Sequence, residues 1–103
     1  MSEMYILDEN GNPVEEKDLM KWAEWIENSR ERRVAYDLVG EHEVSTVFLG
    51  LDHSFGEGEP LLFETMVFID DETSEFHDYC KRYETKEQAV AGHKEVLDKI
   101  KEL

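Results

Sequence analysis

The apolar residues of this chain gather in two runs near its middle, at residues 44–51 and 61–69. Both runs are rich in β-branched and aromatic side chains, and Gly56, Gly58 and Pro60 interrupt the pattern between them. This arrangement predicts a β-hairpin with a long tip. Apolar residues occupy odd and even positions alike, so we expect two central strands that are covered on both faces.

The remaining pattern predicts two helices and two or three further strands. The expected elements are a strand at Tyr5–Leu7, a helix beginning between Glu15 and Asp18, a strand at 34–39, an outer strand at 76–83 and a helix from Thr85 to about Glu102. Thr85 and Gln88 fit a capping box at the start of the last helix. We expect one α+β domain over residues 1–103, with an antiparallel sheet of four or five strands and two helices in the order β-α-β-β-β-(β)-α.

The helices also predict which side chains are buried. The first carries an apolar stripe of Leu19, Trp22, Ala23 and Ile26, and the second buries either Ala89, Val96, Ile100 and Leu103 or Val90 and Leu97 beside His93. Met20 and Trp25 lie off the first stripe and are candidates for exposed apolar side chains. The hairpin strands, apolar on both faces, and these two side chains together present more apolar surface than two short helices can cover. We therefore expect a homodimer.

Charge is strongly unbalanced along the chain. The sequence has 26 Asp and Glu against 11 Lys and Arg, a formal net charge of −15, and no Lys or Arg occurs between Val34 and Cys80. Direct binding of nucleic acid is unfavourable without basic residues. An acidic surface free of positive charge instead fits a basic nucleic-acid-binding protein as partner. The alternative is a solvated surface that serves solubility alone. The candidate partner-binding residues are Asp52, Glu57, Glu59, Asp70, Asp71 and Glu72.

Composition limits the other classes of function. Cys80 is the single cysteine, so no intramolecular disulfide forms, and no apolar stretch is long enough to span a membrane. We expect a soluble protein of a reducing cytoplasm. His77 and Cys80 are three residues apart in a predicted strand and would point to opposite faces, so we expect no metal site and no cofactor.

Two small groups of residues are candidates for chemistry. Asp52, His53 and Glu64 could converge near the hairpin tip and act as acid and base, although an Asp at a strand end more often braces a loop. A ligand pocket could instead be lined by Trp22, Trp25, Tyr79 and His93. The alternative for His93 is helix–sheet packing with a hydrogen bond to a buried carbonyl. Gly92 beside it would allow close approach of a strand or a ligand.

Long blocks of the sequence resemble a widespread family of small proteins encoded by tailed bacteriophages and prophages. The blocks are YILDENGNPV at 5–14, WAEWIE at 22–27, STVFLGLDHSFGEGEPLLFETMVF at 45–68 and RYETKEQAVAGH at 82–93. The resemblance implies a setting, a phage-encoded accessory protein in a bacterial cytoplasm, and implies no particular chemistry.

Three functions therefore remain open from the sequence. The first is an acidic inhibitor of a bacterial defence complex, in the manner of anti-CRISPR proteins. The second is a sponge that sequesters a nucleotide signal in the aromatic pocket. The third is a small enzyme that uses Asp52, His53 and Glu64.

Overall fold

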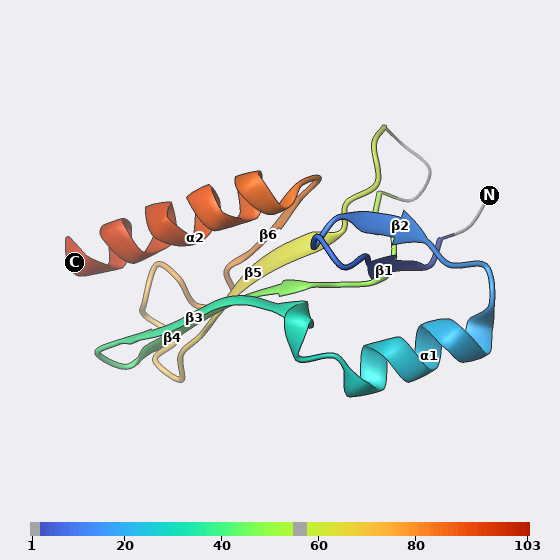
Figure 1. Ribbon diagram of the computed structural model, residues 1–103. Helices are drawn as coiled ribbons and strands as arrows, with labels where there is room; N and C mark the ends of the chain where they lie inside the picture. The colour runs from blue at the N-terminus through green and yellow to red at the C-terminus, as the bar shows by residue number, and fades with distance from the viewer. Residues whose placement is uncertain (1–2, 55–57) are drawn as a thin grey trace.

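The structure is a computed structural model that describes residues 3–54 and 58–103. It has two α-helices and two antiparallel sheets, as the α+β prediction requires (Figure 1). The elements are β1 (Tyr5–Leu7), β2 (Pro13–Glu15), α1 (Leu19–Asn28), a 3-10 turn (Arg30–Arg32), β3 (Arg33–Val39), β4 (His42–Phe48), β5 (Phe63–Phe68), β6 (Cys80–Tyr83) and α2 (Lys86–Lys101).

The larger sheet has the strand order β3-β4-β5-β6, and all of its pairings are antiparallel. The predicted hairpin is confirmed, because β4 and β5 pair from Glu43 and Phe68 to Phe48 and Phe63 and occupy the centre of the sheet. The predicted outer strand begins late. The backbone turns at residues 76–79, where the Tyr79 N–H donates to the Phe76 carbonyl, and pairing with β5 starts only at Cys80.

The smaller sheet is a hairpin of β1 and β2 that the sequence predicted only in part. The Asp8 carboxylate accepts hydrogen bonds from the N–H groups of Asn10 and Asn12, each at 2.9 Å, and Gly11 has a φ of 81°. This is the chemistry expected of an Asx-stabilised turn. β2 escaped prediction because it is three residues long and begins with a proline, which weakens a strand pattern.

The helix α1 begins at the predicted place, since the Asp18 carboxylate accepts from the Met20 and Lys21 N–H groups at 2.9 and 3.3 Å. Its inward stripe differs from the prediction. Trp22, Trp25 and Ile26 are partly buried, whereas Leu19 and Ala23 are exposed. Met20 is exposed, as expected, but Trp25 is not.

Gly50 determines the position of α1, because its carbonyl binds the helix and its missing side chain leaves room for it. The Trp22 indole N–H donates to the Gly50 carbonyl at 2.9 Å, and the Tyr5 N–H donates to the same oxygen at 2.8 Å. A side chain at Gly50 would overlap Ile26. The helix therefore packs with β1 beyond one end of the larger sheet and does not lie across the sheet (Figure 1).

The helix α2 covers one face of the larger sheet (Figure 1). The predicted capping box is present: the Thr85 hydroxyl accepts from the Gln88 N–H, and the Gln88 side chain accepts from the Thr85 N–H. The buried residues of α2 are Ala89, Gly92, His93, Val96 and Ile100. This agrees with the first predicted stripe except at Leu103, which is exposed, as is Val90 of the alternative stripe.

The expectation that the central strands are covered on both faces is wrong for the isolated chain. Along β4, Val44, Thr46 and Phe48 are buried beneath α2, and the residues between them are only partly buried. No helix of the described residues lies on the second face. None of the described helices is long and apolar enough to cross a membrane.

Candidate functional site

A chain of hydrogen bonds links α2 to three strands through the sheet face that α2 covers. His93 Nε2 lies 2.8 Å from the Asp37 carboxylate, and His93 Nδ1 lies 2.7 Å from the Thr46 hydroxyl. The Thr46 hydroxyl lies 2.5 Å from the hydroxyl of Thr65. With a neutral imidazole, Nε2 donates to the carboxylate, and Nδ1 accepts from Thr46, which accepts from Thr65 in turn.

This order of carboxylate, imidazole and hydroxyl is the order found in nucleophilic catalysis. The hydroxyl, however, is sealed: Thr46 and Thr65 are fully buried, and His93 is 4% exposed. A substrate therefore has no approach to the oxygen that would attack. The group holds α2 on the sheet, as the packing alternative for His93 proposed, but its partners are a carboxylate and a hydroxyl and not a carbonyl.

Gly92 adds a second constraint at the same level of α2. A Cβ atom there would overlap the ring and hydroxyl of Tyr83, which comes from β6. The close approach foreseen for this glycine is thus made by a strand side chain. It leaves no room for a ligand between helix and sheet.

The tip residues proposed for acid–base chemistry do not assemble. The Asp52 carboxylate accepts from the Ser54 and Leu61 N–H groups at 2.8 and 3.1 Å, which braces the loop. Partial burial raises the pKa of Asp52, but these hydrogen bonds outweigh it and the pKa lies below its usual value. His53 Nδ1 lies 2.9 Å from the Leu51 carbonyl.

Glu64 is engaged elsewhere, on the second face of the sheet. Arg82 Nε donates to its carboxylate at 3.0 Å, and the Cys80 thiol lies 3.3 Å from the same oxygen. Partial burial, together with this carboxylate, raises the pKa of the Cys80 thiol. His77 pairs with Asp78 instead of Cys80. Within residues 3–54 and 58–103, no three His, Cys, Asp or Glu side chains are grouped to hold a metal ion.

The four residues proposed for a ligand pocket are also separated. Trp22 bonds to Gly50, and Trp25 packs edge-on against Phe48 with 5.7 Å between ring centroids. Tyr79 packs on Phe76 in a second apolar cluster, while His93 is buried under α2. No described cavity joins them.

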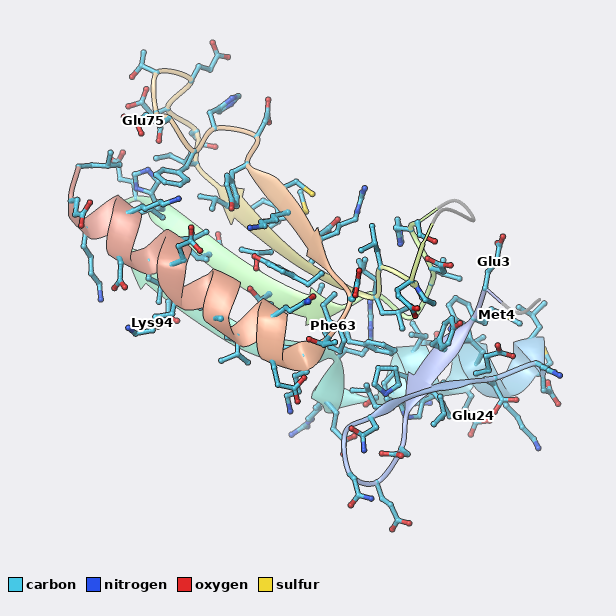
Figure 2. All side chains as sticks on the ribbon, turned by 90° about the horizontal axis from the view of Figure 1, so that it is seen from above. Glu3, Met4, Glu24, Phe63, Glu75 and Lys94 are labelled. Atoms are coloured by element: carbon cyan, nitrogen blue, oxygen red, sulfur yellow. The ribbon has the colours of Figure 1, made fainter. Side chains whose placement is uncertain are left out.

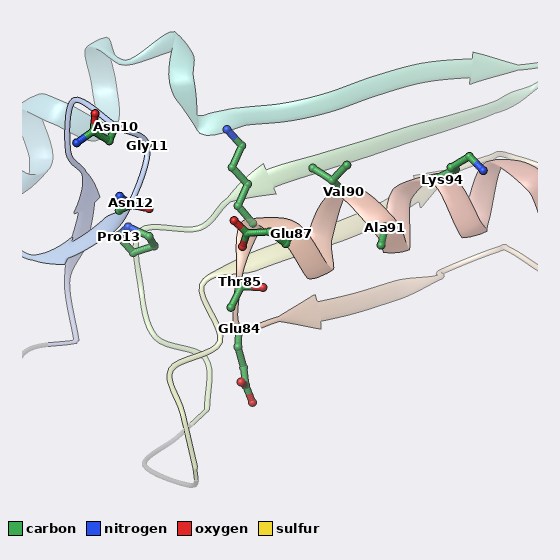
Figure 3. Close-up of a pocket in the computed structure, with 11 residues that line it drawn as sticks. Asn10, Gly11, Asn12, Pro13, Glu84, Thr85, Glu87, Val90, Ala91 and Lys94 are labelled. Carbon is green, nitrogen blue, oxygen red and sulfur yellow. The ribbon is translucent and has the colours of Figure 1, made fainter.

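A cleft of about 670 Å³ lies where β1–β2 meets α2 (Figure 3). Its walls are the hairpin turn and the first turns of α2, and Pro13, Val90 and Ala91 supply its apolar lining. Lys86 and Lys94 line it together with Glu84 and Glu87, so its charges are balanced. Sequence reasoning missed this cleft because it depends on how the short hairpin meets the helix.

Exposed carboxylates gather at one end of the sheet in a segment that we call the acidic loop, residues 70–78. Its exposed acids are Asp70, Asp71, Glu72, Glu75 and Asp78. No Lys or Arg in residues 3–54 and 58–103 forms an ion pair with any of them.

Internal bonds hold the acidic loop in shape. The Asp71 carboxylate accepts from the N–H and hydroxyl of Thr73, at 2.9 and 2.6 Å, and these bonds lower the pKa of Asp71. The Ser74 hydroxyl lies 2.9 Å from His42 Nε2. Phe76 is buried in the core between these turns and anchors the loop.

A second group of acids surrounds Tyr5 at the other end of the sheet, and we call it the tip cluster: Glu15, Asp52 and Glu59. Partial burial and then these three carboxylates raise the pKa of the Tyr5 hydroxyl. Glu15 was not among the predicted residues, because only the pairing of β2 with β1 brings it there. Glu57, which was predicted to bind the partner, lies outside the described residues.

The predicted partner-binding residues thus form two groups and not one. β5 separates them, and its six residues span about 20 Å. Figure 2 shows Glu75 and Glu3 at opposite ends of the molecule.

Comparison of the chain with family models, with curated proteins and with solved structures finds no match.

Proposed function

We propose that this protein is a phage-encoded acidic binding protein that inhibits a bacterial defence complex in the host cytoplasm. In this proposal its carboxylates occupy a nucleic-acid-binding surface of a basic partner, in the manner of anti-CRISPR proteins. The observation that carries the proposal is the acidic loop, whose exposed carboxylates have no Lys or Arg partner in the described part of the chain.

The construction of the acidic loop supports a binding role. The bonds of Asp71 and Ser74 and the burial of Phe76 fix the backbone that carries the acids. A loop ordered before binding loses little conformational entropy when it meets a partner. Carboxylates on such a loop favour association with a basic groove more than carboxylates on a mobile tail do.

The separation of the two acidic groups also fits the proposal. The acidic loop and the tip cluster lie at the two ends of β5, which spans about 20 Å and is therefore shorter than one turn of B-DNA, about 34 Å. A channel that holds one turn of a duplex therefore has the length to receive the acidic loop and the tip cluster together.

The two other functions are less well supported. An enzyme would need Asp52, His53 and Glu64 to act on one substrate, yet each is held by a different partner. A nucleotide sponge would need the aromatic side chains around one cavity, and they lie in separate parts of the core.

The test is inhibition of duplex binding by a panel of purified CRISPR effector complexes, measured by gel shift with labelled target DNA. The variant Asp70→Lys/Glu72→Lys reverses two exposed acids and keeps Asp71, which braces the loop. We expect at least about a tenfold loss of inhibition and a weaker salt dependence, because charge pairs across an interface set the rate of encounter.

The matched control is Glu24→Lys/Glu27→Lys, which makes the same change in net charge at two exposed positions of α1. Glu24 is labelled in Figure 2. This control should keep inhibition within about twofold, since these positions lie outside both acidic groups. Equal inhibition by both variants would overturn the role of the acidic loop. Failure of the wild-type protein to inhibit any complex would overturn the proposal as a whole. Loss of activity in His53→Ala alone would favour a reactive tip.

A further inference from the structure

α2 leaves one face of the larger sheet uncovered, and we call this the open face. The strand pairings place its residues in three rows across the sheet. The rows are Leu38, Glu43 and Phe68; then Tyr36, Ser45, Met66 and Cys80; then Arg33, Val47, Glu64 and Arg82.

Large apolar side chains lie exposed on the open face. Leu38 is 65% exposed, Phe68 49% and Tyr36 42%. Only Glu43 stands between Leu38 and Phe68 in their row. Adjacent strands lie about 4.8 Å apart, so these side chains form one patch and not isolated positions. Contiguous apolar patches on a small protein mark interaction surfaces.

The charges of the open face are balanced and satisfied within it. The Tyr36 hydroxyl donates to Glu43 at 2.8 Å, and Arg82 donates to Glu64 at 3.0 Å. The Arg33 guanidinium lies 4.8 Å from the centre of the Tyr36 ring. Two Arg and two Glu give no net charge in a chain whose formal charge is −15. Both acids of this face keep a hydrogen-bond partner when the face is covered, which lowers the cost of burying them.

We propose that a second copy of this chain packs on the open face. In a two-fold dimer each face meets its own copy, so the surface must be compatible with its own charges. The acidic loop and the tip cluster fail this condition, because like charges would meet. The open face fulfils this condition because it carries no net charge. Contact through it leaves the acidic loop and the tip cluster of each copy at the ends of the sheets, outside the interface.

The size of the face sets the expected strength. Four strands and about six residues along each give roughly 15 by 20 Å. This is less than the roughly 800 Å² per partner of a standard stable interface. We therefore expect a dimer of micromolar affinity that dissociates on dilution.

Salt separates this contact from the binding of a basic partner. Two acidic copies repel each other, and salt screens that repulsion, so dimerisation through a neutral apolar face should strengthen as salt rises. Binding of the acidic loop to a basic partner should weaken instead. The two proposals can therefore fail independently.

The experiment is sedimentation equilibrium of the full chain from about 1 µM to about 500 µM, in about 0.05 M and about 0.5 M NaCl. We expect the mass to rise from 12.1 kDa toward twice that value, at lower protein concentration in high salt. Leu38→Asp should weaken dimerisation at least about tenfold, because it places a charge in the apolar patch.

Met20→Asp is the matched control, since Met20 is 76% exposed but lies on α1, away from the sheet. It should dimerise as the wild type does. Circular dichroism of both variants at low concentration checks that each remains folded. A monomer mass at every concentration would overturn the proposal, as would a Leu38→Asp protein that dimerises like the wild type.

Discussion

The two faces of the larger sheet are built from the same four strands but treat their polar groups differently. Beneath α2, the hydroxyls of Thr46 and Thr65 and the imidazole of His93 are sealed from water between Val44 and Phe48. On the open face, Glu43 accepts from the Tyr36 hydroxyl and lies between exposed Leu38 and Phe68, and Glu64 accepts from Arg82.

This difference shows how one short helix divides the sheet. α2 covers one face of the larger sheet, and the buried hydrogen bonds of His93 fix where the helix lies along the strands. The residues of the same strands that point to the open face include apolar side chains. This pattern is typical of a sheet face that packs against another surface.

Phe48→Ala should destabilise the protein by about 3–5 kcal/mol, because it removes a fully buried ring that contacts Trp25 and Phe63. The matched substitution on the open face, Phe68→Ala, should change the free energy of unfolding by less than about 0.5 kcal/mol at protein concentrations where the chain is monomeric. Urea unfolding of both variants measures the contrast. Similar losses in both would show that the open face is buried in the monomer.

Gly92→Ala should cost about 3 kcal/mol, because the added methyl group meets the Tyr83 ring in a packed region. In a loosely packed helix the same change would stabilise the protein by up to about 1 kcal/mol. The sign of the change in unfolding free energy therefore decides whether α2 is pressed against β6 as described. Ala91→Gly, at the exposed neighbouring position, should destabilise by only about 1 kcal/mol.

His93→Leu should lower the free energy of unfolding by about 2 kcal/mol, because the buried Thr46 hydroxyl loses the imidazole nitrogen and keeps only its bond to Thr65, while Asp37 loses its bond to the imidazole. Thr46→Val should cost less in the His93→Leu background than in the wild type, since the Thr46 hydroxyl has already lost the imidazole there. A double-mutant cycle by thermal and urea unfolding gives the coupling. No coupling between the two positions would mean that the imidazole and the hydroxyl act separately.

Thr85→Ala should cost about 1 kcal/mol through loss of the capping box, without weakening dimerisation or partner binding. The reason is that Thr85 holds only the start of α2, on the side of the sheet opposite the open face. Differential scanning calorimetry and sedimentation of the same variant test both parts. A weaker dimer with unchanged stability would place the second copy on α2.

Local signals made much of this fold predictable. The apolar runs gave the central hairpin, and Thr85 and Gln88 gave the start of α2, because these patterns act over a few neighbouring residues. The hydrogen bond between Asp37 and His93 joins residues 56 apart in the sequence, and no local pattern encodes it. The tip cluster is similar, since Glu15 reaches Tyr5 only through a strand too short to predict.

Candidate sites were predicted less well, for a related reason. Asp52, His53 and Glu64 are near one another in the predicted hairpin, but the direction of each side chain follows from strand register and loop bonds. Glu64 pairs with Val47 in the sheet and faces Arg82, away from the loop bonds that hold Asp52. Of the predicted partner-binding acids, Glu59, Asp70, Asp71 and Glu72 are exposed, Asp52 is partly buried, and Glu57 lies outside the described residues. Their division between two ends of the molecule depends on the sheet.

The most direct test of the division between the two faces uses Cys80, the single cysteine, which lies exposed in the middle row of the open face. Its rate constant for alkylation by iodoacetamide is measured on the unmodified chain and on Leu38→Asp, from micromolar to about 500 µM protein. We expect the rate constant to fall as the wild-type concentration rises and to stay constant in the variant, because a second copy covers the open face of the wild type. A wild-type rate constant that does not change with concentration would contradict it.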